Sequence, residues 1–130
     1  LQAMNTGHSG SMTTVHANTP RDALARIETL CMMAGTEIPL SAMRRQMVSE
    51  VDLVIQISRF RSGERKIVSI TEVTGKEGEV VTMQDIFIFQ LSPQAAQSAE
   101  EGFFLCTGFV PKFVDQLKDS GVDLPPDFFM

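Results

Sequence analysis

The sequence is poor in cysteine and contains no long apolar run. No apolar stretch reaches the roughly 18 residues that a membrane-spanning helix needs, which excludes such a helix within these residues. The only cysteines, Cys31 and Cys106, are too few for a disulfide framework, so both are expected to be reduced thiols. No segment repeats itself, which excludes a solenoid or other repeat architecture.

An excess of basic charge is also missing. The net charge of -5 argues against general nucleic-acid binding. The charge is uneven, because residues 1–75 hold eight Lys and Arg against seven Asp and Glu, whereas residues 76–130 hold three against nine. The basic residues before residue 75 predict either a solvated face or a surface that meets phosphates or an acidic neighbouring subunit. These residues are Arg21, Arg26, Arg44, Arg45, Arg59, Arg61, Arg65 and Lys66.

Glycine, histidine and hydroxyl residues concentrate in residues 6–20, where we expect the chemistry of this chain. The glycines predict a turn, because they permit positive φ and close backbone approach. Residues 11–17 are rich in β-branched residues and predict a strand. Thr19 suits the N-cap of a following helix, and Pro20 suits its first position. His16 is therefore expected where a strand runs out toward a helix N-terminus, which is where ligands bind in α/β folds.

The two histidines, His8 and His16, have three possible roles when the residues alone are considered. The first is a local hydrogen bond beside the turn. The second is a metal site completed by Cys31 and the carboxylates of Asp22 and Glu28, although no Cys-x-x-Cys or His-x-x-x-His pattern supports it. The third is phosphate sensing, and composition does not decide among the three.

The remaining elements predict one globular domain of mixed class, with 43% apolar residues for its core. Apolar residues at three- and four-residue spacing predict helices at 20–34 and 40–50. Alternating apolar residues joined by short turns predict an antiparallel meander with strands at 52–58, 65–74 and 79–90. The small, polar residues 91–102 predict a linker. The final segments are expected to be a strand at 103–107, a helix at 111–120 and an extended tail whose phenylalanines need a docking surface.

One long run of residues carries a family resemblance. It reads Thr6-Gly7-His8-x-Gly10-Ser11-x-Thr13-Thr14-x-His16-Ala17-Asn18-x-Pro20-Arg21-Asp22-Ala23-Leu24-x-Arg26-x-Glu28. This run resembles the histidine box of the type II/IV secretion ATPase superfamily, and more narrowly that of the CpaF-type ATPases of tight-adherence (Flp) pilus assembly. Later segments are similar to the same family, so that the resemblance spans nearly the whole chain: residues 52–56, 70–73, 84–87, 108–113 and 124–125.

The resemblance implies an α/β fold, the C-terminal part of a RecA-like P-loop NTPase domain with an antiparallel β-meander and a C-terminal helix. Its implied organisation is a motor-domain portion at 1–90, a linker at 91–102 and a strand, helix and aromatic tail at 103–130. The phosphate-loop pattern Gly-x-x-x-x-Gly-Lys-Ser/Thr is absent. The family's Walker A and Walker B residues are therefore expected upstream of Leu1, and the fragment is expected to be inactive alone.

The resemblance also implies site residues, position by position. His8 and His16 would occupy the two histidine positions of the box, and His16 would lie near the γ-phosphate to tell ATP from ADP. Gly7, Thr13 and Thr14 would lie close to the nucleotide. Rings of this kind often supply an arginine to a neighbour's phosphate, and the candidates here are Arg21, Arg26, Arg44 and Arg45. No metal ligand is expected in the fragment.

The implied cofactors are ATP and Mg²⁺ in the full-length protein, with none expected bound to the fragment. The implied partners are further copies in a hexamer, with self-association of the fragment, and platform proteins of the inner membrane; nucleic acid is not among them. The implied location is the cytoplasmic side of the inner membrane. An alternative is a non-catalytic interaction module, favoured by the acidic region after Gly75 and the aromatic tail. A third class is a small metal-binding protein that uses His8, His16 and Cys31.

Overall fold

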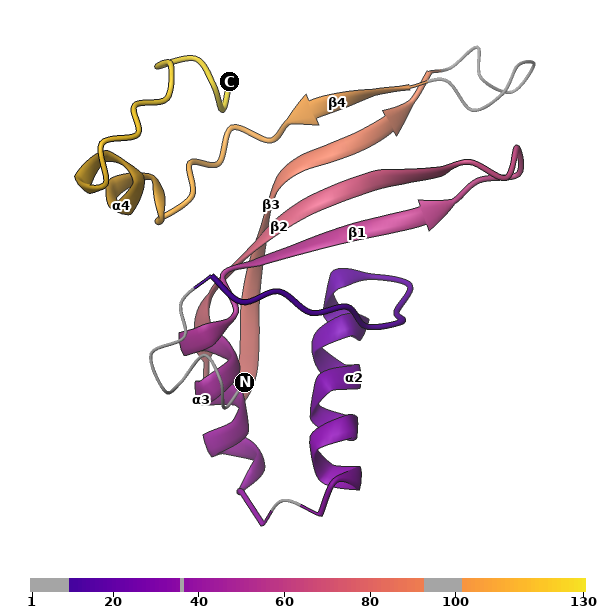
Figure 1. Ribbon diagram of the computed structural model, residues 1–130, viewed down its shortest axis with the longest axis vertical. Coiled ribbons are helices and arrows are strands. Elements are labelled where there is room, and N and C mark those ends of the chain that lie inside the picture. The colour runs from indigo at the N-terminus through magenta and orange to yellow at the C-terminus, as the bar shows by residue number, and fades with distance from the viewer. Residues whose placement is uncertain (1–9, 36, 93–101) are drawn as a thin grey trace. The chain divides into compact units, whose positions relative to one another are not determined.

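The computed structural model describes residues 10–35, 37–92 and 102–130. Two helices come first in these residues, strands follow them, and one short helix comes last (Figure 1). The helices are α2 (Pro20–Met33), α3 (Leu40–Glu50) and α4 (Val114–Asp119), and the strands are β1 (Leu53–Arg59), β2 (Arg65–Glu77), β3 (Val80–Leu91) and β4 (Gly102–Cys106). Among the described residues, none of these helices has the length and apolar character to cross a membrane.

The four strands form one sheet in the order β1-β2-β3-β4, which is the predicted meander with one further strand. β3 and β4 pair antiparallel, with Phe89 opposite Phe104 and Leu91 opposite Gly102. Gly102 is required here, because a Cβ at this position would overlap the Gln90 carbonyl oxygen and the Phe89 ring. The predicted linker 91–102 therefore begins and ends at paired residues, and its residues 93–101 lie outside the described part of the chain.

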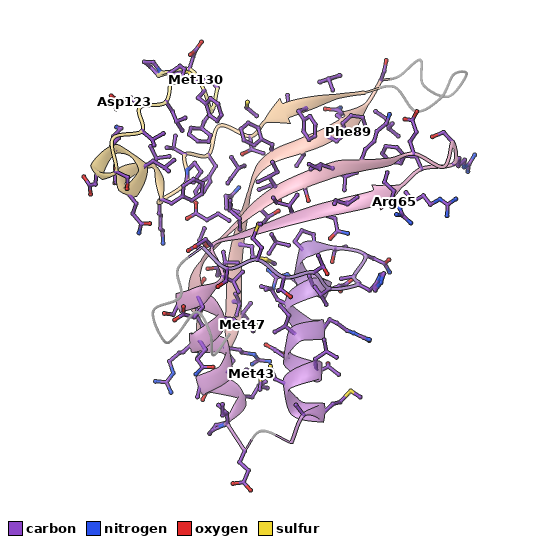
Figure 2. The ribbon with its side chains drawn as sticks, in the orientation of Figure 1. Met43, Met47, Arg65, Phe89, Asp123 and Met130 are labelled. Atoms are coloured by element: carbon purple, nitrogen blue, oxygen red, sulfur yellow. The ribbon has the colours of Figure 1, made fainter. Side chains whose placement is uncertain are left out.

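The residues divide into two compact units, which β2 and β3 both traverse. Of the described residues, unit 1 comprises 10–35, 37–54 and 73–83, and unit 2 comprises 55–72, 84–92 and 102–130. The core of unit 1 is formed by aliphatic and methionine side chains, with Met47 fully buried and Met43 2% exposed (Figure 2). Leu24 of α2 and Val73 and Val81 of the strands complete this cluster, so the two helices and the strand pair share one core.

Unit 2 is held together by phenylalanine rings. Phe89 lies 5.8 Å from Phe60 and 5.6 Å from Phe104, measured between ring centroids. Farther along β3, Phe87 lies 6.2 Å from Phe128 and 6.0 Å from Phe129 of the C-terminal tail. The expected docking surface of the two tail phenylalanines is therefore the face of β3 that carries Phe87.

Most predicted elements are present with shifts of one to three residues at their ends, and three expectations are wrong. Residues 11–17 form no strand, because a strand needs a hydrogen-bonded neighbour and the sheet does not include this segment. The C-terminal helix is shorter than 111–120, since α4 begins at Val114. The tail is not extended at its end: the Phe128 N–H donates to the Pro125 carbonyl and closes a turn. The expected helix end at residues 1–5 lies outside the described residues.

Candidate functional site

The segment before α2 carries the candidate site. Its residues 11–19 lie outside the helices and strands. Thr14 and His16 are exposed, whereas Val15 and Ala17, which alternate with them along the chain, are partly buried. This alternation anchors the segment through its apolar side chains and leaves the hydroxyl and the imidazole accessible. Thr13 is exposed as well, so three phosphate-compatible donors are accessible in four consecutive residues.

The start of α2 is fixed immediately after this segment. The Thr19 backbone is extended, and its side-chain oxygen accepts a hydrogen bond from the Asp22 N–H at 3.0 Å. Pro20 occupies the first turn, where its missing N–H is not needed. The predicted N-cap is therefore confirmed. Because the positive end of a helix dipole favours anions, the position of His16 just upstream suits a phosphate-binding role.

Two of the four candidate arginines are engaged within unit 1. Arg21 Nη1 donates to the Val81 carbonyl oxygen at 3.3 Å, which ties the start of α2 to β3. Arg44 of α3 donates through Nε to Glu28 Oε1 of α2 at 2.9 Å and through Nη1 to Glu79 Oε2 at 3.5 Å. The hydrogen bond with Glu28 raises the pKa of the Arg44 guanidinium above its ordinary value. Arg44 thus joins α3 to α2 and to the turn between β2 and β3.

Arg26 and Arg45 differ from these two. Both side chains are exposed, and neither forms an ion pair with any residue in the described part of the chain. They are therefore the candidate arginines that are accessible to another molecule. Gly7 and His8 lie outside the described residues, so the structure brings His16 together only with Thr13 and Thr14 of the predicted set.

The described residues suit a phosphate better than a metal ion. An imidazole and two hydroxyls can donate hydrogen bonds to phosphate oxygens. In contrast, no three His, Cys, Asp or Glu side chains come together as a metal site within residues 10–35, 37–92 and 102–130. His16, Asp22, Glu28 and Cys31 thus form no such group, and the oxygen ligands that Mg²⁺ prefers are not gathered by these residues.

Sequence reasoning missed the buried polar residues of unit 2. The Glu72 side chain is 3% exposed, and its two carboxylate oxygens accept the Lys112 backbone N–H at 3.0 and 3.2 Å. Its neighbour Thr71 donates to Asp85 Oδ1 at 2.7 Å. A carboxylate in the middle of a predicted strand, between Thr71 and Val73, is the signal that could have identified this contact. It attaches the C-terminal segment to β2.

Comparison with known proteins places this site in a family. The sequence model of the family described as type II/IV secretion system protein matches residues 1–101. A Mycobacterium tuberculosis protein named provisionally as a conjugal transfer protein is 36% identical over 80 residues, which are 62% of this chain and 22% of that protein. Conjugal transfer protein TrbB of Rhizobium radiobacter is 38% identical over 78 residues, 60% of this chain and 22% of TrbB.

A third relative belongs to a secretion machine by its name. Type IV secretion system protein PtlH of Bordetella pertussis is 36% identical over 75 residues, 54% of this chain and 22% of PtlH. The matched stretch is thus about a fifth of the length of each of these relatives. The family match covers well over half of the chain, including the whole candidate site and the sheet up to β3. The chain therefore belongs to the type II/IV secretion system protein family.

Proposed function

We propose that this chain is the C-terminal part of the motor domain of a secretion ATPase of the CpaF type, which couples ATP hydrolysis to pilus biogenesis or protein export. The observation that carries the proposal is the exposed His16 immediately before the capped start of α2, inside the region of the family match. The mixed fold with its antiparallel sheet is compatible with the closing part of a RecA-like domain.

In this proposal His16 senses the terminal phosphate of the nucleotide. Its imidazole donates a hydrogen bond to a terminal phosphate oxygen or orients the attacking water, and so distinguishes ATP from ADP. Thr13 and Thr14 donate from the same segment, and His8 and Gly7 complete the predicted set. Val15 and Ala17 have partly buried side chains on either side of the exposed His16, which supports a fixed path for this segment.

The chain alone is proposed to be inactive. It contains no phosphate loop, and its described residues gather no carboxylate group for Mg²⁺. ATP and Mg²⁺ would supply the phosphoryl group and the charge neutralisation in the whole protein, where residues outside this chain hold them. The part played by this chain is therefore to couple the state of the nucleotide to the position of α2.

We also propose that the whole protein works as a hexamer on the cytoplasmic side of the inner membrane, bound to platform proteins of the machine and not to nucleic acid. An arginine contributed to a neighbour's phosphate would come from the accessible pair, Arg26 and Arg45, before Arg21 and Arg44. The first two have free guanidinium groups within the described residues, whereas the latter two are held by Val81 and by Glu28 and Glu79.

The test is steady-state ATP turnover by the whole protein that carries this chain, by the chain alone, and by a His16→Ala variant of the whole protein. We expect turnover by the whole protein, none by the chain, and a loss of about 10²-fold or more in the variant, the scale of a catalytic contact. Met12→Ala is the matched control, because Met12 is 97% exposed in the same segment and has no proposed role. A fully active His16→Ala variant would refute the role of the histidine.

The second candidate is a non-catalytic interaction module that docks a partner of the secretion machine. It is favoured by the C-terminal segment, where Val122 and Phe128 are 45% exposed and Met130 is 83% exposed beside four exposed aspartates. The same turnover measurement separates the two. A whole protein that neither hydrolyses nor binds ATP would leave the module as the function of this chain.

A further inference from the structure

Opposite charges gather at opposite ends of unit 2. Residues 55–72 carry four basic side chains against two acidic ones, and residues 102–130 carry two basic side chains against four acidic ones. The four basic side chains are Arg59, Arg61, Arg65 and Lys66, and the four acidic ones are Asp115, Asp119, Asp123 and Asp127. All four aspartates and all three arginines are exposed.

Contacts within unit 2 separate these two groups in space. The hairpin turn between β1 and β2 lies at the Phe89 end of β3, since Phe60 of this turn packs on Phe89 at 5.8 Å. The C-terminal segment lies nearer the middle of β3, since the Lys112 N–H donates to Glu72, Thr107 Oγ1 donates to the Asp85 carbonyl oxygen, and Phe128 packs on Phe87. About 13 Å of strand separates Phe89 from Asp85 at a rise of roughly 3.3 Å per residue. Figure 2 shows Arg65 and Asp123 far apart in unit 2.

Each charged end also carries exposed apolar side chains. β1 and β2 both expose their odd-numbered residues near the turn, so that Ile55, Ile57 and Ile67 are 52%, 56% and 39% exposed next to Arg59 and Arg65. We call this the hairpin face. Val122, Phe128 and Met130 are exposed among the aspartates, and we call this group the acidic tail. An apolar centre with a charged border is the composition of a protein interface.

We propose that the hairpin face of one copy binds the acidic tail of the next copy, so that the chain associates head to tail. The partner that fits is a second copy of the chain, because every copy carries both the basic hairpin face and the acidic tail. Since the two surfaces are different and lie at opposite ends of unit 2, the contact is heterologous and leads to a closed ring or an open filament. This contact rests on the proposed oligomer and names its surfaces, but its formation requires no nucleotide.

Charge reversal and complementation test this contact. Sedimentation without nucleotide would compare the unaltered chain, a head variant (Arg61→Glu, Arg65→Glu), a tail variant (Asp119→Lys, Asp123→Lys) and an equimolar mixture of both variants. We expect the unaltered chain to associate more weakly as salt rises. Each variant alone should associate about tenfold or more weakly, and the mixture should recover, because the reversed head of one fits the reversed tail of the other.

Two control variants separate this contact from a general effect of net charge. Lys118→Glu changes the net charge by the same amount as Arg61→Glu, but it adds a negative charge to the end of unit 2 that is already acidic. Glu64→Lys changes the net charge by the same amount as Asp119→Lys, but it adds a positive charge to the end that is already basic. Both should associate at least as well as the unaltered chain. An unaltered chain that stays monomeric at low salt, or a mixture that stays as weak as its components, would overturn the inference. Failure of ATP turnover would not overturn the inference, since association is measured without nucleotide.

Discussion

The two units of the molecule are stabilised by different kinds of contact. Unit 1 buries aliphatic and methionine side chains from α2, α3 and two strands around Met47, and Arg44 joins the two helices to each other and to the turn between β2 and β3. Unit 2 buries Ile86 of β3, pairs phenylalanine rings along the same strand, and contains a buried carboxylate that accepts a hydrogen bond from a backbone N–H. A small antiparallel sheet with few buried aliphatic side chains can thus gain stability from ring pairs and from one buried carboxylate.

The contrast extends to the surfaces of the units. Unit 1 carries the accessible donors of the candidate site, Thr13, Thr14 and His16. Unit 2 carries exposed apolar residues bordered by charge, which is the composition of an interface. In our proposal, unit 1 senses the nucleotide and unit 2 contacts the next copy.

The largest effect is expected from a substitution in the core of unit 1. Met47→Ala removes a fully buried side chain and leaves a cavity, so we expect a loss of about 2–5 kcal/mol in the free energy of unfolding. Denaturant unfolding measures this loss. Met32→Ala is the control, because the Met32 side chain is 61% exposed and its removal should cost no more than about 0.5 kcal/mol. Equal losses for the two variants would contradict the description of the core.

A smaller effect is expected from the polar anchor of unit 2. Glu72→Gln replaces one acceptor oxygen by an NH2 group, which only donates, so the Lys112 N–H loses one of its two acceptors, and we expect a loss of about 1–3 kcal/mol in the free energy of unfolding. Hydrogen exchange should accelerate at Lys112 and in α4, while the amides of α2 keep their protection. Glu77→Gln, at an exposed position of the same strand, should change neither. Unchanged exchange at Lys112 in Glu72→Gln would show that the anchor is not needed.

The smallest of these effects concerns the N-cap of α2 in unit 1. Thr19→Ala removes the side-chain acceptor of the Asp22 N–H at the start of α2, and we expect a loss of about 1 kcal/mol. Thr29→Ala is the matched control inside the same helix, because the Thr29 hydroxyl bonds only back to the Ala25 carbonyl, which the helix already satisfies. Denaturant unfolding should rank Thr19→Ala below Thr29→Ala in stability, and the reverse order would be inconsistent with the cap.

The sequence predicts elements well where local chemistry determines them. The bounds of α2 follow from Thr19 and Pro20 at its start and from Gly35, whose φ of 74° ends the helix. The meander follows from alternation and short turns. The strand at 11–17 fails for a non-local reason, since β-branched residues favour a strand but pairing decides it.

Contacts between distant residues could not be predicted in the same way. Glu28 and Arg44 each lie on an amphipathic helix, and nothing in either pattern specifies that the helices face each other there. Leu30 has the apolar spacing of α2 and yet is 45% exposed, because the core of unit 1 reaches only as far as Ile27 on that helix. For the candidate site, the proposed roles of the residues follow from the family resemblance, whereas the exposure of His16 follows only from the structure.

The most direct test of the account is the discrimination between ATP and ADP by the whole protein that carries this chain. Equilibrium binding of both nucleotides would be measured for the unaltered protein and for His16→Ala, with Met12→Ala as the control. We predict that His16→Ala weakens ATP binding and leaves ADP binding unchanged, because in our proposal the imidazole contacts the terminal phosphate of ATP, which ADP lacks. Equal ATP-to-ADP affinity ratios in the unaltered protein and the variant would contradict the phosphate-sensing role.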